Sequence, residues 1–253
     1  MTAALMTALG LCMVGTAFLS GIFGMAGGLI LIGILLALLP VPEAMALHAV
    51  TQMASNGWRG LLWWRHIRPR AAAGYLAGSA LALAAWSFIQ FVPDKPLATL
   101  LLGVAPFTVR LLPARFKPDA ARLDHGIAYG AVCMSLLLLT GVVGPLVDTF
   151  FLGGKLGRRE IVATKALCQI VGHAMKLIYF TSIAARASNI DGTLIVVAIA
   201  ASMAGTTAAR RFLETMSDVQ YRAWSAYIIT LISGCYVLQG VYLFVAPVLR
   251  GVA

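Results

Sequence analysis

Ten apolar segments, most of them close to the length of a membrane-crossing helix, account for almost the whole chain. A helix needs ~20 apolar residues to cross the hydrocarbon core of a bilayer. The segments are residues 2–20, 27–40, 43–65, 70–92, 95–112, 124–140, 145–155, 159–182, 190–210 and 221–247. The sequence therefore predicts an all-α polytopic membrane protein.

The composition favours lipid over water as the solvent of this chain. Hydrophobic residues make up 60% of the 253 residues and charged residues only 11%, whereas soluble domains carry about 25% charged residues. The net charge of +10 would fit nucleic-acid binding in a soluble protein. Here the basic residues gather in short loops between apolar segments, as they do in the cytoplasmic loops of membrane proteins. We therefore expect a lipid bilayer and no nucleic acid as partners.

Several motifs that would indicate other functions do not occur. The first basic residue is Arg59, so the N-terminus lacks the basic region of a signal peptide, and we expect the first segment to be retained. The four cysteines lie in apolar segments without metal-ligand spacing. No metalloprotease, hydrolase or nucleotide-binding motif appears. The sequence predicts no enzyme, no cofactor and no metal.

Two short segments, 27–40 and 145–155, each follow a glycine-containing break and precede a long segment. The glycines match at an offset of 120 residues and the long segments at 117, which pairs Gly21 with Gly141, Gly24 with Gly144, Glu43 with Glu160, Ala46 with Ala163, Ala49 with Ala166, Gln52 with Gln169 and Arg59 with Lys176. This indicates an internal repeat, with chance similarity of apolar stretches as the alternative. The predicted domains are a first transmembrane repeat (1–112), a cytoplasmic linker (113–123) and a second repeat (124–253).

The loop charges predict the orientation of the segments. If every segment crosses, one side receives Arg65, Arg68, Arg70, Arg110, Arg115, Lys117, Arg122, Lys155, Arg158, Arg159, Arg210, Arg211 and Arg222, and the other only Lys95, Arg186 and Arg250. The positive-inside rule then places both termini outside. Five segments per repeat is an odd number, so the repeats would be inverted in topology. Re-entrant short segments are the alternative, and they would reopen the location of the termini.

The glycine breaks are candidate parts of a substrate site. A broken helix exposes unpaired N–H groups at the start of the next half-helix, and these groups attract anions. The glycines of the two breaks that we assign to the site are Gly24, Gly27, Gly28, Gly141 and Gly144. The alternative is that they only allow close helix packing.

The long segment after each break carries a polar face with a cation. His48, Gln52, Ser55 and Arg59 share one helical face, with Thr51 and Asn56 beside it; Lys165, Gln169 and Lys176 share the matching face, with His173 beside it. Ionisable groups inside a membrane are costly and usually line a cavity or pathway. The alternatives are that the glutamines join helices and that the cations extend to the membrane surface. We predict that both faces contact substrate.

Acidic residues are scarce inside the apolar segments. Only Asp148 lies well within one, where it could cap a short helix or carry a proton. Asp148 and His173 are therefore the proton-coupling candidates. The excess of buried cations favours a negatively charged substrate.

These stretches resemble the TauE/SafE family of sulfite and organosulfonate exporters. The resemblance is carried by residues 21–28 and the apolar run to Pro40, by residues 44–59, and by the second copy at 140–145 and 163–166. It implies a secondary transporter whose glycine breaks and adjacent long helices form the substrate site. The second break departs from the pattern, because it lacks a Gly-Gly pair and is followed by Asp148.

The function predicted from these features is alternating-access transport of a small anion, such as sulfite or a sulfoacetate-like organosulfonate. The alternatives are an anion channel and a transporter of small carboxylates. We expect a multi-pass protein of the cell inner or plasma membrane. The sequence is also compatible with a homodimer.

Overall fold

The structure is a computed structural model that describes residues 3–23, 26–111, 118–120, 122–152, 156–184, 190–215 and 218–251. These residues form ten α-helices, a 3-10 turn (Trp64–His66) and a π-helical turn (Tyr179–Ile183), and no strand. The helices are α1 (Ala3–Phe23), α2 (Ala26–Leu38), α3 (Val41–Trp63), α4 (Pro69–Ile89), α5 (Lys95–Arg110), α6 (Leu123–Thr140), α7 (Gly144–Leu152), α8 (Arg158–Ile178), α9 (Gly192–Thr215) and α10 (Asp218–Gly251). Each predicted segment corresponds to one helix. The largest difference is at the end of α9, where helical hydrogen bonding continues five residues beyond the predicted end.

Local sequence signals explain where several helices begin and end. α3 begins after Pro40 and has a proline in its first turn, where a missing N–H costs no hydrogen bond. α4 is followed by Gln90 and α6 by Gly141, both in the left-handed conformation (φ 49° and 80°) that commonly stops a helix. α8 begins with a cap, because the Gly157 N–H donates to the Glu160 carboxylate at 3.0 Å. These signals set where the two helices that carry the polar faces, α3 and α8, begin.

The loop before α4 is attached to the start of α8. Arg68 forms an ion pair with Glu160, and its backbone N–H donates to the Thr164 hydroxyl at 2.9 Å. The hydrogen bond from Arg68 also holds the pKa of the Glu160 carboxyl below its ordinary value. The two halves of the chain are therefore joined at a basic loop.

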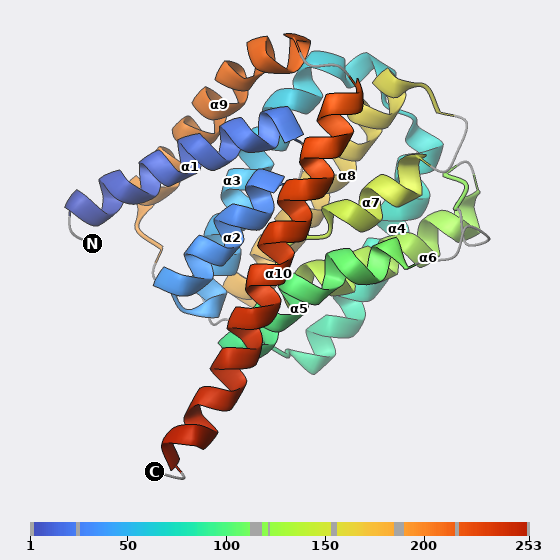
Figure 1. The fold of residues 1–253 in the computed structure, drawn as a ribbon. Helices are drawn as coiled ribbons and strands as arrows, with labels where there is room; N and C mark the ends of the chain where they lie inside the picture. Colours follow the sequence, from blue (N-terminus) through green and yellow to red (C-terminus); the bar gives the residue numbers. More distant parts are fainter. Residues whose placement is uncertain are drawn as a thin grey trace.

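Four pairs of helices make the most extensive contacts: α1 with α9, α4 with α6, α3 with α8, and α5 with α10. Figure 1 shows α1 and α9 side by side and α10 crossing the front of the molecule. Exchanging α1–α5 for α6–α10 in order converts the α1–α9 pair into α6–α4. The same exchange leaves α3 paired with α8 and α5 paired with α10.

Glycines allow two of these pairs to approach closely. In the α4–α6 pair, a Cβ added to Gly130 would lie 2.0 Å from the Tyr75 carbonyl oxygen. In the α1–α9 pair, a Cβ added to Gly205 would lie 2.3 Å from the Val14 carbonyl oxygen. Neither atom fits, and such close backbone contact is typical of helix packing in membranes.

Six helical stretches in the described part of the chain are long and apolar enough to cross a membrane: Met6–Phe23, Pro69–Ile89, Leu123–Thr140, Ala163–Ile183, Gly192–Ala209 and Ala226–Pro247. Ala26–Leu38 and Lys95–Thr108 are apolar but shorter. α3 is long enough but carries too many polar residues to belong to this set. Its His48, Ser55 and Asn56 are buried in the protein, so its polar face is shielded by neighbouring helices. The structure is that of an all-α multi-pass membrane protein.

Candidate functional site

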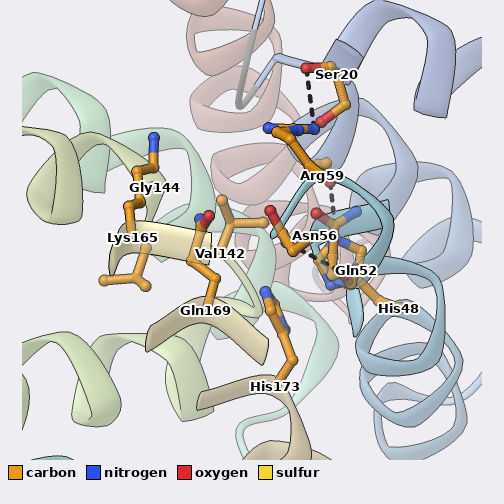
Figure 2. A pocket seen from close by; sticks show the side chains of 12 residues that line it. Ser20, His48, Gln52, Asn56, Arg59, Val142, Gly144, Lys165, Gln169 and His173 are labelled. Carbon is orange, nitrogen blue, oxygen red and sulfur yellow. Dashed lines mark hydrogen bonds between the residues drawn. The ribbon is translucent and has the colours of Figure 1, made fainter. Parts of the chain in front are cut away.

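A small pocket lies between the polar faces of α3 and α8 (Figure 2). It has a cavity volume of about 20 Å³, which is enough for one water molecule. The residues that line it are Ser20, Gly28, His48, Gln52, Asn56, Arg59, Val142, Val143, Gly144, Lys165, Gln169 and His173. Both halves of the chain therefore contribute to one pocket.

The α3 side of the pocket offers amide and guanidinium groups. His48, Gln52, Asn56 and Arg59 follow the spacing of one helical face. The Asn56 side-chain amide donates to the Gln52 backbone carbonyl at 2.9 Å, which fixes its orientation. Arg59 Nη2 lies 3.5 Å from the backbone carbonyl of Ser20, so the guanidinium is held beside the end of α1.

The α8 side carries Lys165, Gln169 and His173, again on one face. Figure 2 shows Lys165 on the opposite side of the pocket from Arg59. The Lys165 ammonium forms an ion pair with Asp148 on α7. The His173 side chain is buried, and its Nδ1 has no hydrogen-bond partner within the described residues. An unpaired buried nitrogen is costly, which makes this atom a candidate contact for a molecule in the pocket.

Both short helices begin at the pocket. Gly28 lies in the first turn of α2, and Gly144 is the first residue of α7. The N–H groups at the start of a helix lack partners within it and carry partial positive charge. A Cβ added to Gly28 would lie 3.2 Å from the Gln52 side-chain oxygen, so glycine keeps this backbone close to α3. Helix starts and side-chain cations together give the pocket a positive potential.

A chain of hydrogen bonds joins the two glycine breaks, and we call the residues Gly28, His48, Lys176 and Gly141 the strut. His48 Nε2 donates to the Gly28 carbonyl at 3.0 Å, and its Nδ1 accepts from the Lys176 ammonium group at 3.0 Å. Lys176 also donates to the Gly141 carbonyl at 3.1 Å. It is 0% exposed, so the alternative that it extends to the membrane surface is wrong. The His173 ring packs edge-on against His48 at 5.6 Å between centroids.

The structure gathers most of the predicted site residues at this pocket. Those that line it are Gly28, His48, Gln52, Asn56, Arg59, Gly144, Lys165, Gln169 and His173. Those that do not are Gly27, Thr51, Ser55, Gly141 and Lys176. Gly24 lies outside the described residues.

The predicted residues outside the pocket have contacts that explain their type. A Cβ added to Gly27 would lie 1.8 Å from the Thr16 carbonyl oxygen, so Gly27 lets α2 pack on α1. Thr51 donates to the His48 carbonyl, and the Ser55 hydroxyl lies 2.9 Å from that of Thr206 on α9. The contacts of Gly27 and Ser55 support the packing of helices, whereas the hydrogen bond of Thr51 lies within α3.

Three lining residues were missed by the sequence analysis: Ser20, Val142 and Val143. Ser20 is a polar residue at the edge of the first break, and this position was the signal that could have identified it. Val142 and Val143 are apolar residues in an apolar stretch and give no such signal. Asp148 was predicted to cap a helix or carry a proton, and the sequence did not reveal its ion pair with Lys165.

The chemistry of the pocket is that of charge and hydrogen bonding. Within the described residues, no group of three or more His, Cys, Asp or Glu is placed to hold a metal ion. The side chains that line the pocket offer guanidinium, ammonium, amide, imidazole and hydroxyl groups. Such groups bind oxyanions, and guanidinium can do so through two parallel hydrogen bonds.

A comparison with known protein families identifies the family of this chain. Residues 9–236 match the family described as sulfite exporter TauE/SafE, a range that includes every residue of the pocket. Comparisons with curated proteins and with solved structures found no match. The family match covers most of the chain and agrees with its apolar, multi-helix fold. The chain therefore belongs to the sulfite exporter TauE/SafE family.

Proposed function

We propose that this protein is a secondary transporter that moves a small sulfur-containing oxyanion or organosulfonate by alternating access through the pocket between α3 and α8. Family membership implies the coarser statement, a membrane transporter of sulfite or related anions. The more specific proposal, on the substrate and its path, rests on the position of Arg59 and Lys165 on opposite sides of a pocket where two helices begin. Cations and helix N–H groups that converge in this way suit the oxygens of a sulfite or sulfonate group.

The arrangement of the helices supports two inverted repeats. The exchange of α1–α5 for α6–α10 preserves the main helix pairs. An odd number of helices in each half would make the halves run in opposite directions. The pocket lies between matching helices of the halves, where inverted-repeat transporters usually place their substrate site. Rocking of one half against the other would then expose the pocket to each side in turn.

The orientation follows from the loop charges. The basic loops predict a multi-pass protein of the inner or plasma membrane with both termini outside. We keep a homodimer as part of this proposal, tested by the mass of the detergent-solubilised protein.

Proton coupling through His173 and Asp148 is a further part of the proposal. The unpartnered Nδ1 of His173 lies within the described pocket, and Asp148 contacts the pocket-lining Lys165. Both are groups that can exchange a proton. An imposed pH gradient should therefore change the rate of anion transport, and an unchanged rate would remove this coupling route.

The binding site is tested by ligand-dependent thermal stabilisation of the purified protein. A panel of sulfite, thiosulfate, sulfonates, phosphate and carboxylates separates sulfur anions from the carboxylate alternative. We expect the melting temperature to rise with sulfur anions, and this rise to be lost in Arg59→Ala. Arg70→Ala, which removes an exposed arginine at the start of α4, is the matched control. An equal rise in Arg59→Ala and the control, or none with any sulfur anion, would contradict the assigned site.

A further inference from the structure

Asp148 places a negative charge next to the pocket, because its ion-pair partner Lys165 lines that pocket. It lies on α7, four residues after the pocket-lining Gly144, and therefore on the same helical face. Its carboxylate pairs with Lys165 of α8. The two side chains are 30% and 15% exposed, respectively, so bulk water screens this pair only in part.

The ion pair and a bound anion would require the same donor. Lys165 lines the pocket, and its ammonium is engaged by Asp148. A buried ammonium without a partner is strongly destabilised, and Asp148 relieves that cost when no substrate contacts Lys165. An anion that reaches Lys165 must share or replace this contact.

Two other basic side chains near the pocket, His48 and Lys176, form hydrogen bonds with each other and with backbone carbonyl groups. His48 donates through one ring nitrogen and accepts through the other, which is the bonding pattern of an uncharged imidazole. Lys176 donates to His48 and to Gly141 in the strut and does not line the pocket. Lys165 both lines the pocket and pairs with a carboxylate, so Asp148 can act on the substrate through it.

We propose that Asp148 is an internal counter-ion that competes with the substrate for Lys165 and thereby favours singly charged over doubly charged anions. This inference rests on the proposed function and narrows its substrate class. The repulsion between Asp148 and a ligand scales with the ligand's charge, so a dianion loses twice as much binding free energy as a monoanion. Asp148 therefore disfavours sulfate and other dianions more than it disfavours hydrogen sulfite and monosulfonates.

Sulfate and methanesulfonate are matched probes for this selection. Sulfate carries four oxygens on its sulfur atom, whereas methanesulfonate carries three and a methyl group in place of the fourth, so the two differ by that group and by one charge. Their dissociation constants are measured with purified protein at constant ionic strength. Asp148→Asn should tighten methanesulfonate binding roughly tenfold and sulfate binding roughly a hundredfold.

Asp124→Asn is the matched control. Asp124 also belongs to an ion pair, with Arg122, but both side chains are mostly exposed and lie outside the pocket. This substitution changes the protein's charge by the same amount, so a general charge effect would appear in both variants. We expect it to change neither dissociation constant.

A second pair of variants, made in a Lys165→Gln protein, keeps the proposal testable if Asp148→Asn alone misfolds. In Lys165→Gln, removal of Asp148 leaves no lysine unpaired. The direct repulsion between Asp148 and the anion remains in this background, so Asp148→Asn should again favour sulfate more than methanesulfonate, by a smaller factor because the competition for Lys165 is gone. An unchanged ratio of the two dissociation constants in both backgrounds would overturn the counter-ion role and leave the proposed function standing. Failure of the unaltered protein to bind either anion would count against the proposed function itself.

Discussion

The polar faces of α3 and α8 occupy the same register in the two halves of the chain but place their cations in different surroundings. Arg59 of α3 lines the pocket, whereas its counterpart Lys176 is fully buried in the strut. His48 belongs to the strut, whereas its counterpart Lys165 pairs with Asp148. Two matching helical faces thus form one pocket to which α3 supplies Arg59 and α8 supplies Lys165, while Lys176, outside the lining, bonds to His48 and links the two breaks.

The largest effect is expected from breaking the strut. Lys176→Met keeps the side-chain volume but leaves His48 Nδ1 and the Gly141 carbonyl without their donor. We expect loss of transport and a stability loss of about 2–4 kcal/mol, because each unpaired buried polar group costs ~1–3 kcal/mol. Lys165→Met, at a partly exposed position of the same helix, should weaken anion binding with a smaller loss of stability. Thermal unfolding of the two variants measures this difference, and equal losses would contradict the division of roles.

The two glycine breaks should respond differently to alanine. Gly141 has φ 80°, and an added Cβ would lie 2.8 Å from Met45 Sδ; Gly141→Ala should therefore cost about 1–2 kcal/mol through its left-handed backbone alone. At Gly28 the three atoms nearest to an added Cβ all belong to the flexible end of Gln52, at 3.2 Å or more. Gly28→Ala should keep the melting temperature and reduce anion affinity several-fold. A melting temperature that falls equally in both variants would show that the breaks serve the same purpose.

The smallest effect concerns Glu43 and Glu160, which match in the predicted repeat and lie near the starts of α3 and α8. Arg68 holds the pKa of Glu160 below its ordinary value, so the stabilisation from this pair is present above the unfolded pKa and is lost as pH falls through the folded one. We expect a slight loss of melting temperature below about pH 4, and this loss to be absent in Glu160→Gln. Glu43→Gln should retain it, and identical acid profiles for all three proteins would contradict the role of the pair.

Sequence periodicity was sufficient for the helices and for the faces that meet at the pocket. The ten segments correspond to the ten α-helices of the described residues, and the spacing of Gln52, Arg59, Lys165 and Gln169 placed them on shared faces. Periodicity identifies a face but not the partner it meets or the direction of a flexible side chain. For this reason it did not reveal the Lys165–Asp148 pair or the burial of Lys176 in the strut.

Counterflow of radiolabelled sulfite in proteoliposomes tests the central claim most directly. Liposomes loaded with unlabelled sulfite should accumulate external label transiently above its equilibrium level, because an alternating-access carrier exchanges one anion for another. Arg59→Ala should abolish this overshoot, and Arg70→Ala should retain it. A flux of sulfite without an overshoot would contradict alternating access and favour the channel alternative. An overshoot that is undiminished in Arg59→Ala would contradict the assignment of this pocket as the transport site.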